Sequence, residues 1–349
     1  MQKKIIALAV AGLMSGAAFA QSNVTIYGVV DMSYLYSSKS DSDSLKSRSG
    51  IDSGSQSGSR IGFKGEEALG GGNKVGFVLE NSIGVDTGSG PSMTRQSFLY
   101  GAGSWGTVAA GRQYTPQFNL VAAVDPFGVG TIGDAFTGRG VYFAGIASGD
   151  VIRVDNLLAY ISPSFGGLTV TAGYTMDAAG NEAVTAKGAD SSNIKLWAIN
   201  PVYSNGPLYV AFNYHNAKQD STDFNNKVWD LGATYNFGAV KVAGLYGQNK
   251  VTDGVLDGFK VKQWLLGATV PMGSGALMAS YARMKESATD AKASKFALGY
   301  QYDMSKRTNL YAVYAKISTN DVAEGGFSVR DWTADDYTSG LNVGVRHKF

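Results

Sequence analysis

The sequence predicts an all-β fold, a 16-stranded antiparallel transmembrane β-barrel with a constriction loop folded into its lumen. Three observations support this prediction. Runs of about ten residues with apolar side chains at alternate positions recur along the chain, an export signal precedes them, and one long connection carries many apolar residues. Successive side chains of a strand point to opposite faces of the sheet, so such runs predict strands with one apolar and one polar face.

The N-terminus has the pattern of a secretory signal peptide. Lys3 and Lys4 precede an apolar run from Ile5 to Met14, and small residues end at Ala20. The run is too short for a membrane-spanning helix, which needs about 20 residues; a buried N-terminal helix is the alternative. We therefore expect a signal peptide at residues 1–20 and a single barrel domain at residues 21–349, with the inward-folded constriction loop at residues 113–150.

Composition and charge exclude several classes of protein. The chain has 30 Lys and Arg and 28 Asp and Glu, and removing residues 1–20 removes two lysines and no acids. A neutral mature chain argues against a nucleic-acid partner, because proteins that bind nucleic acids usually carry a basic surface. There is no cysteine, so neither a lipoprotein signal nor a disulfide is expected. The 46 Gly, 19 Tyr and 16 Phe favour a large β-structure.

Side-chain alternation defines the expected strands. In the run that ends at Glu66, Ile61 and Phe63 share one face, while Arg60 and Lys64 share the other. We count about 16 such runs. They lie near residues 23–37, 57–67, 73–84, 95–102, 105–113, 152–161, 167–176, 192–202, 207–216, 227–236, 239–248, 259–270, 275–284, 294–303, 308–317 and 338–349.

The connections alternate between short Gly-rich turns, such as residues 70–72, and longer polar segments, such as residues 37–56. Short turns at one rim and long loops at the other are typical of outer-membrane barrels. A soluble β-sandwich would show the same side-chain alternation. The number of strands and the export signal favour the membrane barrel, and closure leaves no unpaired strand edge in lipid. Aromatic residues near strand ends also favour it: Tyr100, Tyr160, Tyr235 and Phe237.

The connection from Gln113 to Asp150 is longer than structureless loops usually are, which is about 12 to 15 residues. Its apolar residues follow neither helical nor strand spacing, and Phe118, Leu120 and Phe127 are among them. A solvated loop of this length would be polar, so these side chains need a place to be buried. We expect the segment to enter the barrel and narrow its bore.

Basic residues on neighbouring strands flank this connection. The alternation places Phe98 and Tyr100 outward, and therefore places Arg95 inward. The basic residues expected to face the lumen are Arg60, Lys64, Arg95 and Arg153.

Arg112 is harder to place, because it shares the outward parity of Val108 and Ala110. It reaches the lumen only if a bulge intervenes or if the strand has already turned inward at that point. Asp125 and Asp134 lie within the long connection and are expected to supply the opposite charge. Two unit charges about 8 Å apart interact by about 0.5 kcal/mol in water. Such a constriction would favour one sign of ion without excluding the other.

Six stretches carry a family resemblance: Val24–Asp31, Gly58–Gly65, Arg95–Phe98, Gly106–Gln113, Arg153–Asn156 and the terminal Phe349. With them the chain resembles the general-diffusion porins of beta-proteobacterial outer membranes over essentially its whole mature length. The resemblance implies a channel in the cell outer membrane for ions and small hydrophilic solutes, with a modest anion preference.

The same resemblance implies partners and residue roles. It implies a homotrimer in contact with outer-membrane lipid and lipopolysaccharide. Arg60, Arg95 and Arg153 match the basic ladder that lines the constriction in this family. Phe349 matches the terminal aromatic residue that the outer-membrane insertion machinery recognises.

Catalysis and cofactors find little support in the sequence. His215 and His347 lie in no recognisable nucleophile motif, and Asp41 and Asp43 lack the rest of a calcium-binding loop. We therefore expect no enzymatic activity, no metal and no cofactor. Two other functions stay open at this point: a plugged barrel whose outer loops bind a receptor, and a channel specific for one class of solute.

Overall fold

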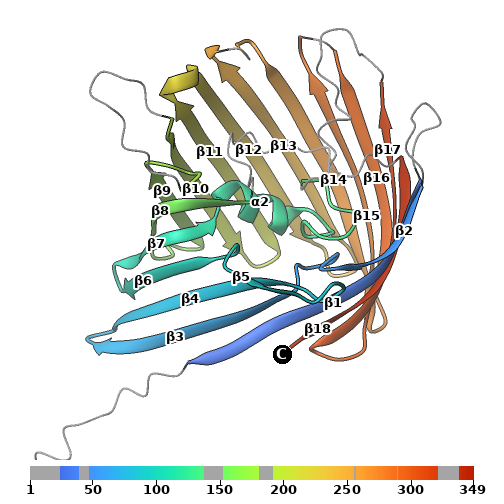
Figure 1. Ribbon diagram of the computed structural model, residues 1–349, viewed down its shortest axis with the longest axis horizontal. Helices are drawn as coiled ribbons and strands as arrows, with labels where there is room; N and C mark the ends of the chain where they lie inside the picture. The colour runs from blue at the N-terminus through green and yellow to red at the C-terminus, as the bar shows by residue number, and fades with distance from the viewer. Residues whose placement is uncertain are drawn as a thin grey trace, which may run out of the picture.

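The computed structural model describes residues 24–38, 47–136, 152–180, 192–254, 257–288, 290–320 and 338–349. The predicted signal peptide and residues 137–150 of the long connection lie outside these ranges. The described chain forms a β-barrel with one helix inside the ring of strands (Figure 1). The strands are β1 (Thr25–Ser38), β2 (Arg48–Ser53), β3 (Arg60–Gly70), β4 (Asn73–Gly84), β5 (Ser89–Ser92), β6 (Ser97–Gly103), β7 (Gly106–Tyr114), β8 (Arg153–Ile161), β9 (Leu168–Thr175), β10 (Ile194–Asn205), β11 (Leu208–Gln219), β12 (Phe224–Asn236), β13 (Lys241–Thr252), β14 (Lys260–Met272), β15 (Gly275–Glu286), β16 (Lys292–Asp303), β17 (Thr308–Thr319) and β18 (Ser339–Lys348).

The barrel closes because β18 pairs antiparallel with β1, from Val29 opposite Lys348 to Ser38 opposite Ser339. The short strand β2 pairs with the same edge of β1 as β3 does, and β5 pairs with the same edge of β4 as β6 does. The strand segments therefore fill 16 positions around the barrel, as predicted. All the strands expected from alternation are present, whereas β2 and β5 were not predicted.

The two faces of the wall differ as the alternation requires. In β16, Phe296, Leu298 and Tyr302 are 42–46% exposed on the outside, while Lys295 is buried on the inside. A Phe or Leu exposed to water at every second position would be costly, but these side chains suit a lipid-facing surface.

The prediction for Phe98 and Tyr100 was wrong, because both face the lumen. Phe98 lies opposite Val78 and Tyr100 opposite Gly76, whereas the intervening Leu99 is 59% exposed on the outside. Strand β6 begins only at Ser97, so alternation cannot be continued back from these residues to Arg95.

The long connection begins with helix α2 (Pro116–Val124), which the sequence analysis did not predict. The side chain of Thr115 accepts a hydrogen bond from the backbone N–H of Phe118 at 3.1 Å, and Pro116 occupies the first turn. No described helix is long and apolar enough to cross a membrane. The helix buries Gln117, Leu120, Val121 and Val124, and these positions have helical spacing. The prediction that the apolar residues of this segment lack helical spacing was therefore wrong.

Helix α2 crosses the bore and packs against the inner face of β10 to β13 (Figure 1). Gly232 on β12 makes this approach possible, since a Cβ there would lie 2.9 Å from both Leu120 and Val124. Beyond the helix, Phe127, Ile132 and Phe136 join the same buried cluster as lumen-facing residues of the wall. Burial of a large apolar side chain contributes about 1.5–3 kcal/mol, so the described part of the loop is firmly attached inside the barrel.

Candidate pore constriction

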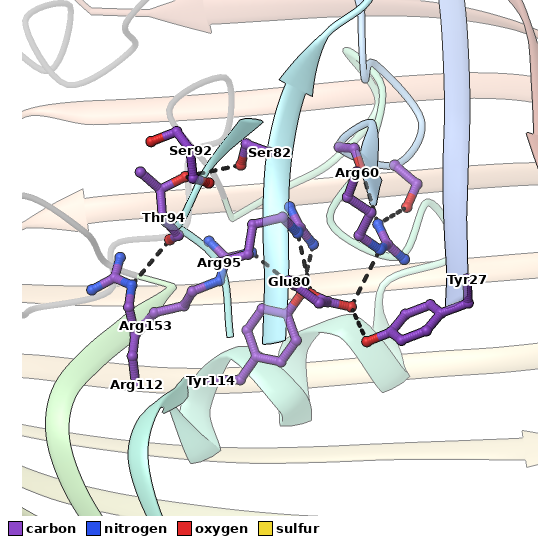
Figure 2. Close-up of polar contacts among 12 residues, drawn as sticks. Tyr27, Arg60, Glu80, Ser82, Ser92, Thr94, Arg95, Arg112, Tyr114 and Arg153 are labelled. Atoms are coloured by element: carbon purple, nitrogen blue, oxygen red, sulfur yellow. Dashed lines mark hydrogen bonds and ion pairs between the residues drawn. The ribbon is translucent and has the colours of Figure 1, made fainter. Parts of the chain in front are cut away.

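A cavity of about 490 Å³ lies where the long connection faces the wall at β3, β7 and β8. Three segments meet there: residues 54–60, residues 128–134 of the long connection, and the ends of β7 and β8. Arg60, Arg95 and Arg153 all line this cavity. Three of the four basic residues expected to face the lumen therefore come together at one place (Figure 2).

Glu80 joins two of these arginines, and the sequence analysis did not single it out. Its two carboxylate oxygens lie 3.4 Å from Nε of Arg60 and 3.2 Å from Nε of Arg95 (Figure 2). Nε of Arg95 donates a hydrogen bond across the 3.2 Å contact, and the hydroxyl of Tyr27 donates a second one to Glu80 at 3.1 Å. Glu80 was recognisable as an inward residue, because it alternates with the outward Phe77 and Leu79.

Tyr114 joins the other pair of arginines. Its hydroxyl accepts hydrogen bonds from Nη2 of Arg95 at 2.9 Å and from Nη2 of Arg153 at 3.3 Å. The guanidinium of Arg153 also lies 4.7 Å from the ring centroid, and the ring stacks on Phe118 of α2 at 4.6 Å. Tyr114 thus holds two arginines in place and connects them to the loop, a role that the sequence did not reveal.

Arg112 and Lys64 do not line the cavity. A β-bulge in the pairing of β7 with β8 sets Asp155 and Asn156 opposite Arg112. This is the kind of irregularity that was expected at Arg112 from its outward parity. The guanidinium of Arg112 pairs with Asp155 at 2.5 Å. It also donates to the carbonyl oxygen of Thr94 at 3.0 Å (Figure 2). Lys64 is exposed further along β3, with its ammonium 5.3 Å from the ring centroid of Tyr27.

The two carboxylates of the loop, Asp134 and Asp125, lie in different environments. Asp134 lines the cavity, and its carboxylate accepts the backbone N–H of Phe136 at 3.1 Å. Asp125 is buried, and its two oxygens accept the backbone N–H groups of Phe127 at 2.9 Å and Ala135 at 2.8 Å. Asp125 therefore braces the loop from within and does not join the arginines.

Burial raises the pKa of the Asp125 carboxyl from 3.8 to about 7, and neighbouring Asp134 adds to this. Between about pH 4 and pH 7 the folded state then holds a proton that the unfolded chain has released, so stability falls as the pH rises through this window. We expect Asp125→Asn to remove a pH dependence of a few kcal/mol. Thermal unfolding of detergent-solubilised protein at pH 4 and pH 8 measures it. An unchanged pH dependence in Asp125→Asn, relative to Asp253→Asn at an exposed loop, would contradict this role.

Residues 54–59, between β2 and β3, fold inward and hold the tip of the loop. The backbone N–H of Thr131 donates to the carbonyl of Ser55. The Gln56 side chain donates to Gln301 at 2.8 Å and accepts from Asn309 at 2.8 Å. These contacts fasten the loop tip to the wall at β16 and β17. Residues 54–56 were expected in an outer loop and residues 57–59 in a strand.

The remaining candidates lie away from the cavity. His215 is buried beside Asn213, whose amide donates to Asp230 at 3.1 Å. Within the described ranges no group of three His, Cys, Asp or Glu side chains could hold a metal ion, and Asp41 and Asp43 lie outside those ranges. Phe349 exchanges two backbone hydrogen bonds of 3.1 Å with Gly28, which continues the pairing of β18 with β1.

Comparisons with known proteins agree with this architecture. A family model described as Gram-negative porin matches residues 7–322. Outer membrane porin protein 32 of Delftia acidovorans is 36% identical, and an outer membrane porin protein of Bordetella pertussis is 30% identical, each over 100% of both chains. A solved structure, the anion-selective porin from Comamonas acidovorans, is 33% identical with a TM-score of 0.80, covering 94% of this chain and 100% of that one. The chain therefore belongs to the Gram-negative porin family, the channel proteins of the outer membrane.

Proposed function

We propose that this channel prefers anions and that Arg60, Arg95 and Arg153 set the preference. The observation that carries the proposal is the convergence of three guanidinium groups on one cavity, where the only carboxylate among the described lining residues is that of Asp134. Glu80 pairs with Arg60 and Arg95 from behind them, so three positive charges stand against two negative ones among these described residues. The positive charge is therefore in excess where the bore is narrowed. The relative from Comamonas acidovorans, described as an anion-selective porin, supports the same direction.

The long connection, residues 113–150, acts in this proposal as the constriction loop. Its described part buries α2 against one side of the wall and presents Asp134 to the cavity. Lys64 adds a second positive charge along β3, beyond Arg60, on the path of an anion that has passed the cavity. Arg112 has a positioning role, because its ion pair with Asp155 fixes the place where the loop leaves the wall.

We propose a homotrimer of barrels, exported with residues 1–20 as a cleaved signal peptide. Phe349 serves as the signal for the insertion machinery, and the outer wall contacts outer-membrane lipid and lipopolysaccharide. The protein acts as a channel for passive diffusion and not as an enzyme.

Planar-bilayer recording tests the channel directly. Purified protein is expected to give stable open channels, and liposomes that contain it are expected to swell in small neutral sugars without saturation. A barrel that binds to surfaces but gives no current and no swelling would contradict passive diffusion. Saturable uptake of one solute class alone would show a specific channel instead.

Glu80→Gln is expected to increase the anion preference. The substitution removes the carboxylate between Arg60 and Arg95, while the amide oxygen can still accept from Tyr27. The zero-current potential across a KCl gradient should shift further toward the anion limit, several-fold in permeability ratio at low salt.

The matched control for this change is Glu66→Gln. Glu66 is an exposed residue of the same strand pair, and it is bound to Lys74 at 2.8 Å and to the hydroxyl of Tyr100 at 2.9 Å instead of to the arginines. A shift of equal size in both variants, or no shift in Glu80→Gln, would remove Glu80 from the selectivity of the pore.

A further inference from the structure

One part of the inner wall is apolar, although the interior of outer-membrane barrels is usually polar. It lies on β6 to β9, between the arginine-lined cavity and the short turns that join β6 to β7 and β8 to β9. A hollow of about 360 Å³ opens there, and Phe98, Tyr100, Leu157, Ile161 and Pro116 are part of its lining. The passage of small hydrophilic solutes does not explain apolar side chains at this place.

The hollow exists because small residues lie side by side on three neighbouring strands. Ala109 of β7 lies directly opposite Ala159 of β8, and Ala159 lies directly opposite Gly173 of β9. Tyr100 of β6 ends this row, since it lies opposite Ala109. Its ring centroid is 6.2 Å from that of Phe98, with 47° between the two planes. The wall is therefore recessed beside two aromatic rings, a shape that accepts another flat ring.

Tyr114 lines both this hollow and the arginine-lined cavity. Its hydroxyl accepts hydrogen bonds from Arg95 and Arg153. A hydroxyl also has one proton to donate, and no group in the described part of the chain accepts it from Tyr114. Hydrogen bonds to a charged partner are the stronger ones, and an O–H held between two guanidinium groups suits an anionic oxygen. One end of the hollow is therefore prepared for an anion.

The remainder of the hollow is uncharged. Its described lining contains no Asp, Glu, Lys or Arg side chain, and its polar members are neutral amides and hydroxyls, such as Gln96 and Thr171. Asn119, an exposed residue of α2, lies at its edge, while the helix itself packs against β10 to β13. An apolar recess with a few polar groups is typical of small-molecule sites. The hollow therefore suits a solute that has an apolar ring and a single negative charge at one end.

We propose that this hollow binds aromatic carboxylates of one ring while they pass through the pore. The ring lies over Ala109 and Ala159 beside Phe98. The carboxylate accepts the proton of the Tyr114 hydroxyl and lies in the field of Arg95. The inference rests on the proposed anion preference, because the arginines attract the solute, and it extends that proposal to a solute class and to residues outside the arginine-lined cavity.

Planar-bilayer recording of the full-length protein measures this binding as a block of the chloride current. Benzoate, acetate or benzyl alcohol is added at neutral pH and constant ionic strength. Acetate has the charge without the ring, and benzyl alcohol has the ring without the charge. The half-blocking concentration of benzoate is expected to be about tenfold lower than that of either compound. Equal block by acetate or by benzyl alcohol would overturn the proposal.

Two variants test the hollow without changing any charge. Phe98→Gln removes one ring of its side wall, and Ala159→Leu fills its floor. In each variant the ratio of the acetate to the benzoate half-blocking concentration should fall from about ten to about one. The control Phe165→Gln removes a ring that is 66% exposed in the short turn between β8 and β9, and should keep the wild-type ratio. A wild-type ratio in both Phe98→Gln and Ala159→Leu, or an equal fall in the control, would contradict the site.

The zero-current potential of the wild-type protein in KCl separates this proposal from the anion preference on which it rests. A potential without anion preference would overturn the role of the arginines, whatever benzoate does. An anion-selective potential that depends on Arg95 and Arg153, together with equal block by benzoate and acetate, would overturn the aromatic site alone.

Discussion

Arg95→Ala/Arg153→Ala is expected to shift the zero-current potential across a KCl gradient toward the cation limit. Both guanidinium groups line the cavity and share the hydroxyl of Tyr114. Removing a positive unit charge about 8 Å from the ion path raises the energy of an anion in the constriction by about 0.5 kcal/mol and lowers that of a cation by the same amount. The two effects add in the ratio of the permeabilities. The anion-to-cation permeability ratio should therefore fall about fivefold for each arginine at low salt.

The control for this double variant removes two positive charges elsewhere. Lys195→Ala/Lys218→Ala changes the net charge equally, but both lysines lie on the outward face and pair with Asp220. Its zero-current potential should equal that of wild type. If the arginine variant also keeps the wild-type potential, neither arginine contributes to selectivity.

Deleting residues 125–134 is expected to enlarge the single-channel current. The segment carries the loop tip that faces the arginines, and the narrowest part of a pore sets most of its resistance. The two ends of the deletion are close, because the carboxylate of Asp125 accepts the backbone N–H of Ala135 at 2.8 Å. Joining Val124 to Ala135 therefore leaves α2 and its packing against the wall in place. We expect a roughly twofold larger conductance in bilayer recordings.

A deletion at the barrel rim separates this effect from a general loosening of the barrel. Removing Ser287 and Ala288, which are exposed between β15 and β16, shortens a connection that does not line the cavity. That variant should keep the wild-type conductance. An unaltered current after deletion of residues 125–134 would place the constriction elsewhere.

Most of the barrel could be predicted because lipid on one side and water on the other impose a period of two on every spanning strand. The strands β2 and β5 lack this signal, since they are short, rich in Ser and Gly, and lie near the ends of longer neighbours. Helix α2 had a usable signal in Thr115 and Pro116, a capping residue followed by a proline in the first turn. Its buried face includes the polar Gln117, which donates to Asp230 at 2.9 Å, and this obscured the apolar pattern.

The cavity was partly predictable, because parity placed Arg60 and Arg153 inward without any knowledge of their partners. Their environment depends on contacts that are distant in sequence. Glu80 meets Arg60 within the regular pairing of β3 with β4, where Gly62 is opposite Glu80. It reaches Arg95 outside that pairing, because Arg95 lies before the start of β6 at Ser97. For Asp125, the hydrogen bond from the N–H two residues later is an Asx-turn, and the sequence does not distinguish a loop aspartate that forms such a turn from one that is an exposed charge.

The zero-current potential of wild-type protein across a KCl gradient, measured at low and at high ionic strength, tests the arginine cavity most directly. At low salt the potential should have the sign of an anion-selective pore. It should shrink toward zero near 1 M salt, where the Debye length falls to about 3 Å and screens the arginines from ions in the bore. A cation-selective potential, or an anion preference that does not change with salt, would contradict the assignment of selectivity to Arg60, Arg95 and Arg153.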